Sequence, residues 1–116
     1  MVGLQTRLVA EGANLPCSIE AERALAARGV LVLPDFIANA GGVICAAIEY
    51  RGGTEEAALT LIAEEICANS EALLDEVRRS GASPRTAAVS LAAERVRRAM
   101  RTRRWDATAG RIALDQ

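Results

Sequence analysis

Residues 8–35 read LVAEGANLPCSIEAERALAARGVLVLPD, and this stretch decides the fold. Its two apolar runs, Leu8–Ala10 and Val30–Leu33, do not alternate with polar residues, which is typical of strands buried on both faces of a parallel sheet. Between them, the apolar spacing predicts a helix that begins after Ser18 and stops at Gly29. A strand, a helix and a strand in this order predict a βαβ unit with parallel strands and a right-handed crossover.

The rest of the chain is predicted to be helical. Asn39 is expected to cap a helix over about residues 41–50. Thr54 is expected to cap a longer helix, whose apolar residues recur every three or four positions and which ends at Gly81. Ser83, followed by proline, signals the start of a last helix. The predicted fold class is therefore α/β, with a partial parallel sheet followed by C-terminal helices.

The composition excludes several kinds of chemistry for this chain acting alone. All 14 basic residues are arginine, because the sequence contains neither lysine nor histidine. Histidine is the usual general base and metal ligand near neutral pH, and lysine is the usual amine catalyst. We therefore predict no catalytic residue and no metal site in this chain.

Charge and cysteine usage bear on partners and location. The net charge is −1. The arginines of residues 95–104 fit a solvated helix end, in which Glu94 pairs with Arg98. Nucleic acid is therefore not an expected partner. The apolar runs are too short to span a membrane. Three widely spaced cysteines favour reduced thiols, as in a cytoplasmic protein.

Polar loops follow both predicted strands. Gly12, Ala13 and Asn14 come after the first strand, and Asn39 with two glycines follows the second. Parallel pairing places both loops around the crevice in which open α/β sheets bind ligands. Small residues let a ligand approach the backbone, and the two amides suit a ribose hydroxyl and a carboxamide. Structural interpretations also fit: a turn in which Asn14 bonds its own backbone, and a helix capped by Asn39.

The strings VAEGANLP and EAERALAARGVLVLPDFIANAGGVICAAIEY resemble the glutamate/leucine/phenylalanine/valine dehydrogenase family, over about residues 7–104. The phrases E-G-A-N and P-D-x-x-x-N-A-G-G-V, at this separation, carry the resemblance. It implies an oxidoreductase that uses NAD or NADP to convert an amino acid such as glutamate to the 2-oxo acid and ammonia. It also implies a Rossmann-like cofactor domain and a homo-oligomer.

The predicted cofactor contacts are Gly12 and Ala13, because they are small, together with Asn14 and Asn39, to which the resemblance assigns roles. In particular, Asn14 would contact the cofactor ribose and Asn39 the nicotinamide carboxamide. Val43 and Ala46 would line the pocket for the substrate side chain. Glutamate-specific members tend to carry serine at the second of these positions and branched-chain members valine, so alanine leaves the amino-acid substrate open.

The resemblance also divides the chain. Residues 1–53 would be the C-terminal part of a Rossmann-like dinucleotide-binding domain, residues 54–105 a helical hairpin of the same domain, and residues 106–116 a tail. The family's glycine-rich fingerprint lies upstream and its catalytic lysines belong to an N-terminal substrate domain, so we expect the chain alone to be inactive. The choice between NAD and NADP stays open. The alternative is a non-catalytic truncated paralogue that acts in oligomerisation or regulation.

Overall fold

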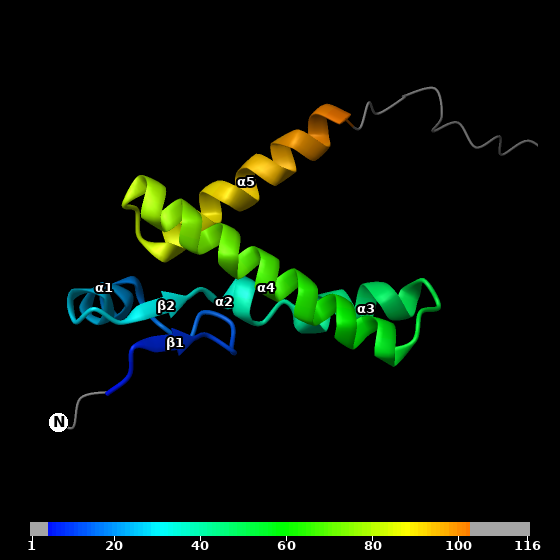
Figure 1. Cartoon of the computed structure of the whole chain (residues 1–116), viewed down its shortest axis with the longest axis horizontal. Coiled ribbons are helices and arrows are strands. Elements are labelled where there is room, and N and C mark those ends of the chain that lie inside the picture. The colour runs from blue at the N-terminus through cyan, green and yellow to red at the C-terminus, as the bar shows by residue number, and fades with distance from the viewer. Residues whose placement is uncertain (1–4, 103–116) are drawn as a thin grey trace, which may run out of the picture.

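The computed structural model describes residues 5–102 and contains a two-stranded parallel sheet (Figure 1). β1 (Leu8–Ala10) pairs with β2 (Leu31–Leu33) so that the first residues of the two strands lie opposite each other. The connection between them contains α1 (Ile19–Ala27), which packs against β2. The predicted βαβ unit with parallel strands is therefore confirmed.

The ends of α1 lie where the sequence predicts them. Ser18 Oγ accepts a hydrogen bond from Ala21 N at 3.2 Å, which satisfies one of the free donors of the first turn. Gly29 follows the helix with φ +73°, a left-handed conformation that favours glycine, and the chain turns there into β2.

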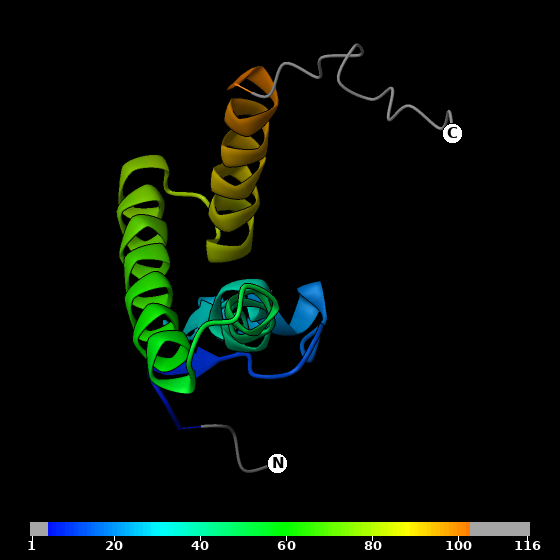
Figure 2. The same cartoon turned by 90° about the vertical axis from the view of Figure 1, so that its right-hand side faces the viewer.

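Up to residue 102, where the described part of the chain ends, four further helices follow β2. α2 (Asp35–Ala38) is a single turn and is not among the helices expected from the sequence. α3 (Gly41–Tyr50) follows, and α4 (Glu55–Ser80) and α5 (Pro84–Thr102) form a hairpin. Figure 2 shows α4 and α5 as neighbouring helices joined by a short loop, and the two helices are in contact. The fold class, a partial Rossmann-like α/β unit with C-terminal helices, is thus confirmed.

The hairpin is capped as predicted. Thr54 Oγ1 accepts a hydrogen bond from Ala57 N at 3.2 Å at the start of α4, and Gly81 ends this helix with φ +68°. Ser83 Oγ accepts from Thr86 N at 3.3 Å at the start of α5. These caps fix the turn that brings the N-terminal end of α5 back to the sheet.

The core lies between α2, the hairpin and the end of β2. Its buried residues are Ile37, Leu73, Ala87 and Ala88. The two alanines of α5 leave room for the helices to approach one another, and Leu73, which exposes 1% of its surface, fills the space between them. This packing holds α5 next to the carboxyl end of β2.

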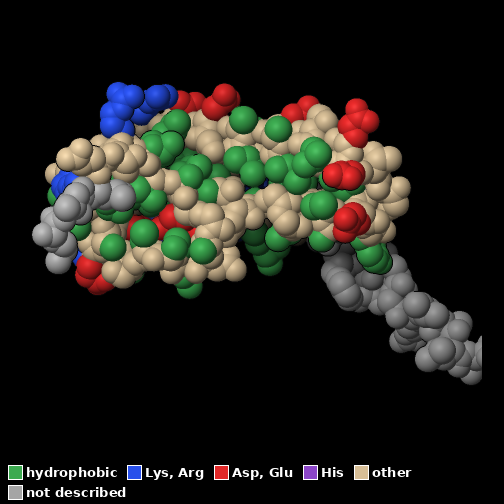
Figure 3. Space-filling model, turned by 90° about the horizontal axis from the view of Figure 1, so that it is seen from below, with side chains coloured by type: hydrophobic (Ala, Val, Ile, Leu, Met, Phe, Trp, Pro, Cys, Tyr) green, Lys and Arg blue, Asp and Glu red, His purple; other side chains and the backbone are tan. Residues whose placement is uncertain are grey.

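The expectation of burial on both faces is wrong for β1. Leu8 exposes 52% of its surface and Ala10 is also exposed, whereas Val32 in β2 exposes 5%. The reason is that α1 and α5 pack against β2, whereas no helix within residues 5–102 packs to a similar extent against β1. Figure 3, seen from the side of β1, shows many apolar side chains at the surface. The predicted end of the hairpin at residue 105 and the predicted tail lie outside the described residues.

Candidate functional site

The loop after β1 forms one half of the candidate site. Glu11 follows the strand directly and its side chain is fully buried, whereas Gly12, Ala13 and Asn14 are exposed. A Cβ on Gly12 would meet no atom within 4 Å, apart from those of Gly12 itself and its two chain neighbours. Leu15 closes the loop with φ +48°, in the left-handed region. The loop therefore presents small residues and one amide to open space.

Asn39 forms the other half, and it contacts the first. Its Nδ2 donates a hydrogen bond to Asn14 Oδ1 at 2.7 Å, although 25 residues separate the two in the sequence. The structure thus brings together two of the residues singled out in the sequence. The expectation that Asn39 caps the next helix is wrong: α3 begins after Ala40 with no side-chain cap, because the Asn39 amide is turned toward Asn14.

α3 presents one face to α4 and leaves the other open. A Cβ on Gly41 would stand 3.3 Å from the side chain of Ile62, so this side of the helix lies close to α4. Val43 exposes 76% of its surface and Ala46 is also exposed. The two residues predicted to line a substrate pocket therefore share the open side of α3, three positions apart.

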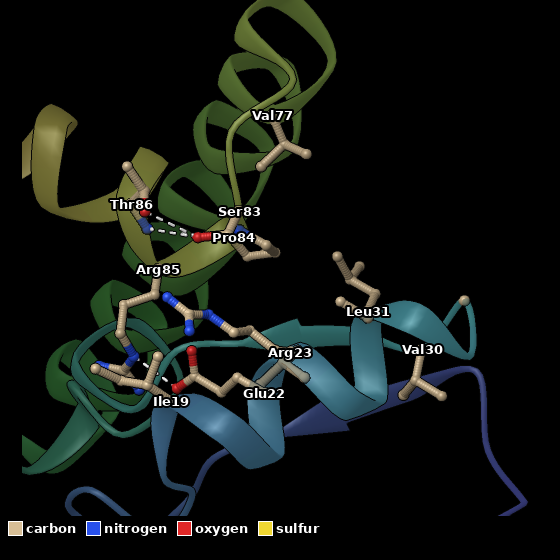
Figure 4. Close-up of a pocket in the computed structure, with 13 residues that line it drawn as sticks. Ile19, Glu22, Arg23, Val30, Leu31, Val77, Ser83, Pro84, Arg85 and Thr86 are labelled. Carbon is tan, nitrogen blue, oxygen red and sulfur yellow. Dashed lines mark hydrogen bonds and ion pairs between the residues drawn. The ribbon is translucent and has the colours of Figure 1, made fainter.

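A cluster of charged side chains lies beneath the two loops. The Arg85 guanidinium at the start of α5 pairs with three carboxylates: Nη2 with Glu11 at 2.8 Å, Nε with Glu22 at 2.6 Å, and Nη1 with Asp35 at 3.1 Å. Figure 4 shows the Arg85 and Glu22 side chains meeting between α1 and α5. Glu11 Oε2 also accepts a hydrogen bond from Asp35 N at 3.0 Å, which links the ends of the two strands.

This cluster shifts the pKa of two neighbouring groups. The hydrogen bond from Leu15 N, together with Arg85, holds the pKa of Asp35 below its usual value. The Glu11 carboxylate, with burial as a second cause, raises the pKa of the half-buried Cys17 thiol. Asp35 is therefore an anion at neutral pH, and Cys17 is a protonated thiol.

Sequence analysis missed Arg85, although a signal for it exists. A positive charge in the first turn of a helix lies at the positive end of the helix dipole, which is unfavourable unless a specific partner compensates. The three carboxylates compensate here. By contrast, the exposed pair predicted between Glu94 and Arg98 is present at 3.5 Å. Such pairs contribute little to stability.

Comparison with known proteins bears on this geometry. The family model described as Glutamate/Leucine/Phenylalanine/Valine dehydrogenase matches residues 2–104. The chain belongs to this family. Among its relatives, the glutamate dehydrogenase of Aeropyrum pernix is 39% identical over 112 residues, which cover 88% of this chain and 27% of that enzyme. The NADP(+)-dependent glutamate dehydrogenase of Pyrobaculum calidifontis is 43% identical over 114 residues, which cover 90% of this chain and 27% of that enzyme.

A third member, the NADP-specific glutamate dehydrogenase of Saccharolobus shibatae, is 37% identical over 108 residues, covering 86% of this chain and 26% of that enzyme. The chain therefore spans about a quarter of the length of these relatives. The motifs E-G-A-N and P-D-x-x-x-N-A-G-G-V both lie within the matched residues, so the paired loops around Asn14 and Asn39 belong to the part that the dehydrogenase family shares.

A separate pocket opens beside Arg85 in this dehydrogenase-family chain. Its volume is about 530 Å³, and apolar side chains of α1, β2 and the hairpin line most of it, among them Ile19, Leu31 and Val77 (Figure 4). None of the six residues predicted for cofactor or substrate lines it. Within residues 5–102, no group of three or more possible ligands is placed to hold a metal ion, and no helix there has the length and hydropathy needed to cross a membrane.

Proposed function

We propose that this chain is the C-terminal part of the nucleotide-binding domain of an NAD(P)-dependent amino-acid dehydrogenase. The whole enzyme would oxidatively deaminate an L-amino acid such as glutamate to the 2-oxo acid and ammonia. The observation that carries this proposal is the hydrogen bond between Asn39 and Asn14, which joins two family loops at the carboxyl edge of a parallel sheet. In open α/β sheets, this edge is where nucleotides bind.

The amides fit the groups they are proposed to contact. Their mutual bond uses one donor of Asn39 and the oxygen of Asn14, so Asn14 Nδ2 and Asn39 Oδ1 remain for a ligand. Asn14 would donate to a ribose hydroxyl, and Asn39 would accept from the nicotinamide carboxamide. The open space above Gly12, beside the small Ala13, would let the cofactor approach the backbone.

The open side of α3 would face the substrate. Val43 would contact the apolar part of the amino-acid side chain, and Ala46 would lie one turn further along. Alanine has no hydroxyl to donate to a side-chain carboxylate, so preference would lean away from glutamate unless another residue supplies a donor. We infer that Ala46→Ser would raise glutamate turnover relative to leucine.

The remaining chemistry would come from other parts of the enzyme. Bound nicotinamide supplies the hydride acceptor, and this chain would orient it through the two amides. The chain contains no lysine or histidine to polarise the substrate or take a proton, so we propose that it needs the N-terminal substrate domain and is inactive alone. A homo-oligomer is part of the same proposal.

The proposal is tested by a chimaera with a relative. Residues 7–102 of this chain would replace the matching segment of the Pyrobaculum calidifontis enzyme, which is 43% identical to it. The chimaera should turn over an amino acid with a nicotinamide cofactor. Asn14→Ala and Asn39→Ala should each raise KM for the cofactor about tenfold, which corresponds to the loss of ~1.4 kcal/mol of binding.

A matched control is Asn69→Ala, which replaces an amide on α4. This change should leave KM for the cofactor unchanged. A correctly folded chimaera that binds no cofactor would overturn the proposal, as would unchanged KM values in both loop variants.

A further inference from the structure

We propose that Arg85 is a positioning residue that holds the two loops of the cofactor edge in their binding geometry. The inference rests on the proposed function, and it deepens that function by tying the site to the C-terminal helix. Arg85 lies 74 residues from Glu11 and 50 from Asp35 in the sequence, and it touches neither Asn14 nor Asn39 by any hydrogen bond or ion pair described for it. Arg85 acts on the two loops through the carboxylates of Glu11 and Asp35.

The first step is the link from Arg85 to the ends of both strands. One guanidinium nitrogen pairs with Glu11, directly after β1, and another pairs with Asp35, which follows β2 by two residues. The side chain of Glu11 is fully buried and that of Asp35 exposes 9%. Without the guanidinium, Glu11, Glu22 and Asp35 would lose the cation that pairs with all three of them, and the contacts that hold the two strand ends together would weaken.

The second step is the link from Asp35 to the first loop. Asp35 uses its two oxygens differently: Oδ1 accepts from Arg85, and Oδ2 accepts from Leu15 N at 2.9 Å. Leu15 holds a left-handed backbone, which a leucine adopts only when the surroundings impose it. The Asp35 carboxylate, oriented by Arg85, imposes that conformation on the residue next to Asn14.

The third step is the outcome at the site. Because Leu15 is fixed, Asn14 Oδ1 lies 2.7 Å from Asn39 Nδ2. Asn14 Nδ2 and Asn39 Oδ1 are then left to bind a ligand. A guanidinium is suited to this role because its planar fork holds several carboxylates at fixed angles, whereas an ammonium is a point charge. The order of contacts is therefore Arg85, Asp35, Leu15, Asn14.

The test uses nuclear magnetic resonance on the whole 116-residue chain, first without ligand. The signals are the hydrogen-exchange rate of Leu15 N–H and the Overhauser contact between the Asn39 side-chain amide and the Asn14 β-protons. In Arg85→Met we expect Leu15 exchange to accelerate about tenfold or more and the amide contact to disappear. The amides of Leu73 and Ala88, in the core, should stay protected.

Three further variants separate positioning from general stability. Arg79→Met removes a guanidinium that is 74% exposed and pairs with Glu76 within α4, and it should leave the loop signals unchanged. Glu22→Gln removes the charge of the one carboxylate partner of Arg85 that does not lie at the end of a strand, and the loop signals should stay close to wild type. Arg85→Lys keeps the charge and loses the fork, so Leu15 exchange should lie between wild type and Arg85→Met.

The results that overturn the proposal are specific. Unchanged loop signals in a folded Arg85→Met chain would overturn it, as would loop and core amides losing protection together in both Arg85 variants. If Arg85→Met fails to fold, Arg85→Lys decides, because unchanged loop signals in that variant would contradict positioning. The proposed function is tested separately in the chimaera with the Pyrobaculum calidifontis enzyme, where absent cofactor binding counts against it, while the ligand-free signals of the 116-residue chain still test Arg85.

Discussion

Asp35 Oδ2 accepts a hydrogen bond from Leu15 N at 2.9 Å, and this bond closes the loop that carries Asn14. Twenty residues separate the two partners, so the contact depends on the parallel pairing of β1 and β2. An ionised carboxylate accepts such a bond more strongly than a neutral one does. The loop at the candidate site is therefore sensitive to the protonation of Asp35.

We predict that the chain loses stability in acid through Asp35. Its pKa is lowered in the folded state, first by Leu15 N and also by Arg85, so ionisation stabilises the fold. This contribution is complete above the unfolded pKa, about 3.9, and is lost as pH falls through the lower folded pKa. Urea unfolding between pH 6 and pH 3 measures it.

Asp35→Asn should lower the free energy of unfolding at pH 7 by about 1–3 kcal/mol and weaken the loss of stability in acid. The matched control is Asp75→Asn, because the Asp75 side chain is 76% exposed and its pair with Arg78 is exposed too. An acid profile that is the same in Asp35→Asn as in wild type would show that other carboxylates set the acid limit.

Two glycines near α3 should respond in opposite directions to alanine. A Cβ on Gly53 would stand 2.5 Å from Ile48 Cγ2 and 3.2 Å from Ile48 O, so rotating the isoleucine cannot relieve both contacts. Gly53→Ala should therefore destabilise by about 1–3 kcal/mol. A Cβ on Gly42, inside the helix, meets nothing within 4 Å, and Gly42→Ala should stabilise by up to about 1 kcal/mol.

Thermal unfolding of the two alanine variants beside wild type checks the sign of each effect. If Gly53→Ala and wild type had the same melting temperature, the turn after α3 would accommodate the added methyl group without loss of stability. That result would contradict the close packing of Gly53 on Ile48.

Much of the fold follows from the sequence because its signals are local. Ser18, Thr54 and Ser83 each cap a helix through the backbone N–H three residues further on, and Gly29 and Gly81 end helices through their own backbone conformation. Each of these choices needs only a few neighbouring residues. The parallel pairing of the two short strands follows from the helix between them.

The site is harder to predict, because its contacts join distant residues. Asn14 and Asn39 were placed on one edge by topology, but their hydrogen bond, and the resulting lack of a cap on α3, depends on how the loops fold. The role of Arg85 could not be predicted from the sequence for the same reason. Its three partners lie 50 to 74 residues away, and no periodicity in the sequence relates them.

We predict that Cys17 reacts slowly with iodoacetamide at pH 8. The Glu11 carboxylate, with burial second and Glu22 as a further cause, raises its pKa, so less reactive thiolate is present. Cys67 is exposed and should be alkylated first. Mass spectrometry of the digested chain measures both rates in one sample.

Glu11→Gln should speed alkylation of Cys17 and leave Cys67 unchanged. Glu22→Gln leaves the ion pairs of Arg85 with Glu11 and Asp35 in place. It should speed alkylation of Cys17 by less than Glu11→Gln does. Equal rates at Cys17 in all three proteins would show that burial alone protects this thiol.

The last prediction is that the isolated chain self-associates. β1 has β2 as its only partner strand within residues 5–102, so its other edge has unpaired backbone groups there. The hairpin also exposes large apolar side chains along α5: Val89 at 53%, Val96 at 58% and Met100 at 70%. Exposed edges and apolar stripes of this kind are commonly buried by pairing between copies.

Light scattering over a dilution series should show a mass above that of one 12.2 kDa chain at micromolar concentration, falling on dilution. Val96→Lys should weaken the association, because it places a charge in the middle of the α5 stripe. Leu15→Lys is the matched control, since Leu15 is 75% exposed but lies in the loop after β1 and is not part of the apolar stripe of α5. A monodisperse monomer at high micromolar concentration would mean that these surfaces stay in water and that the chain needs no second copy to cover them.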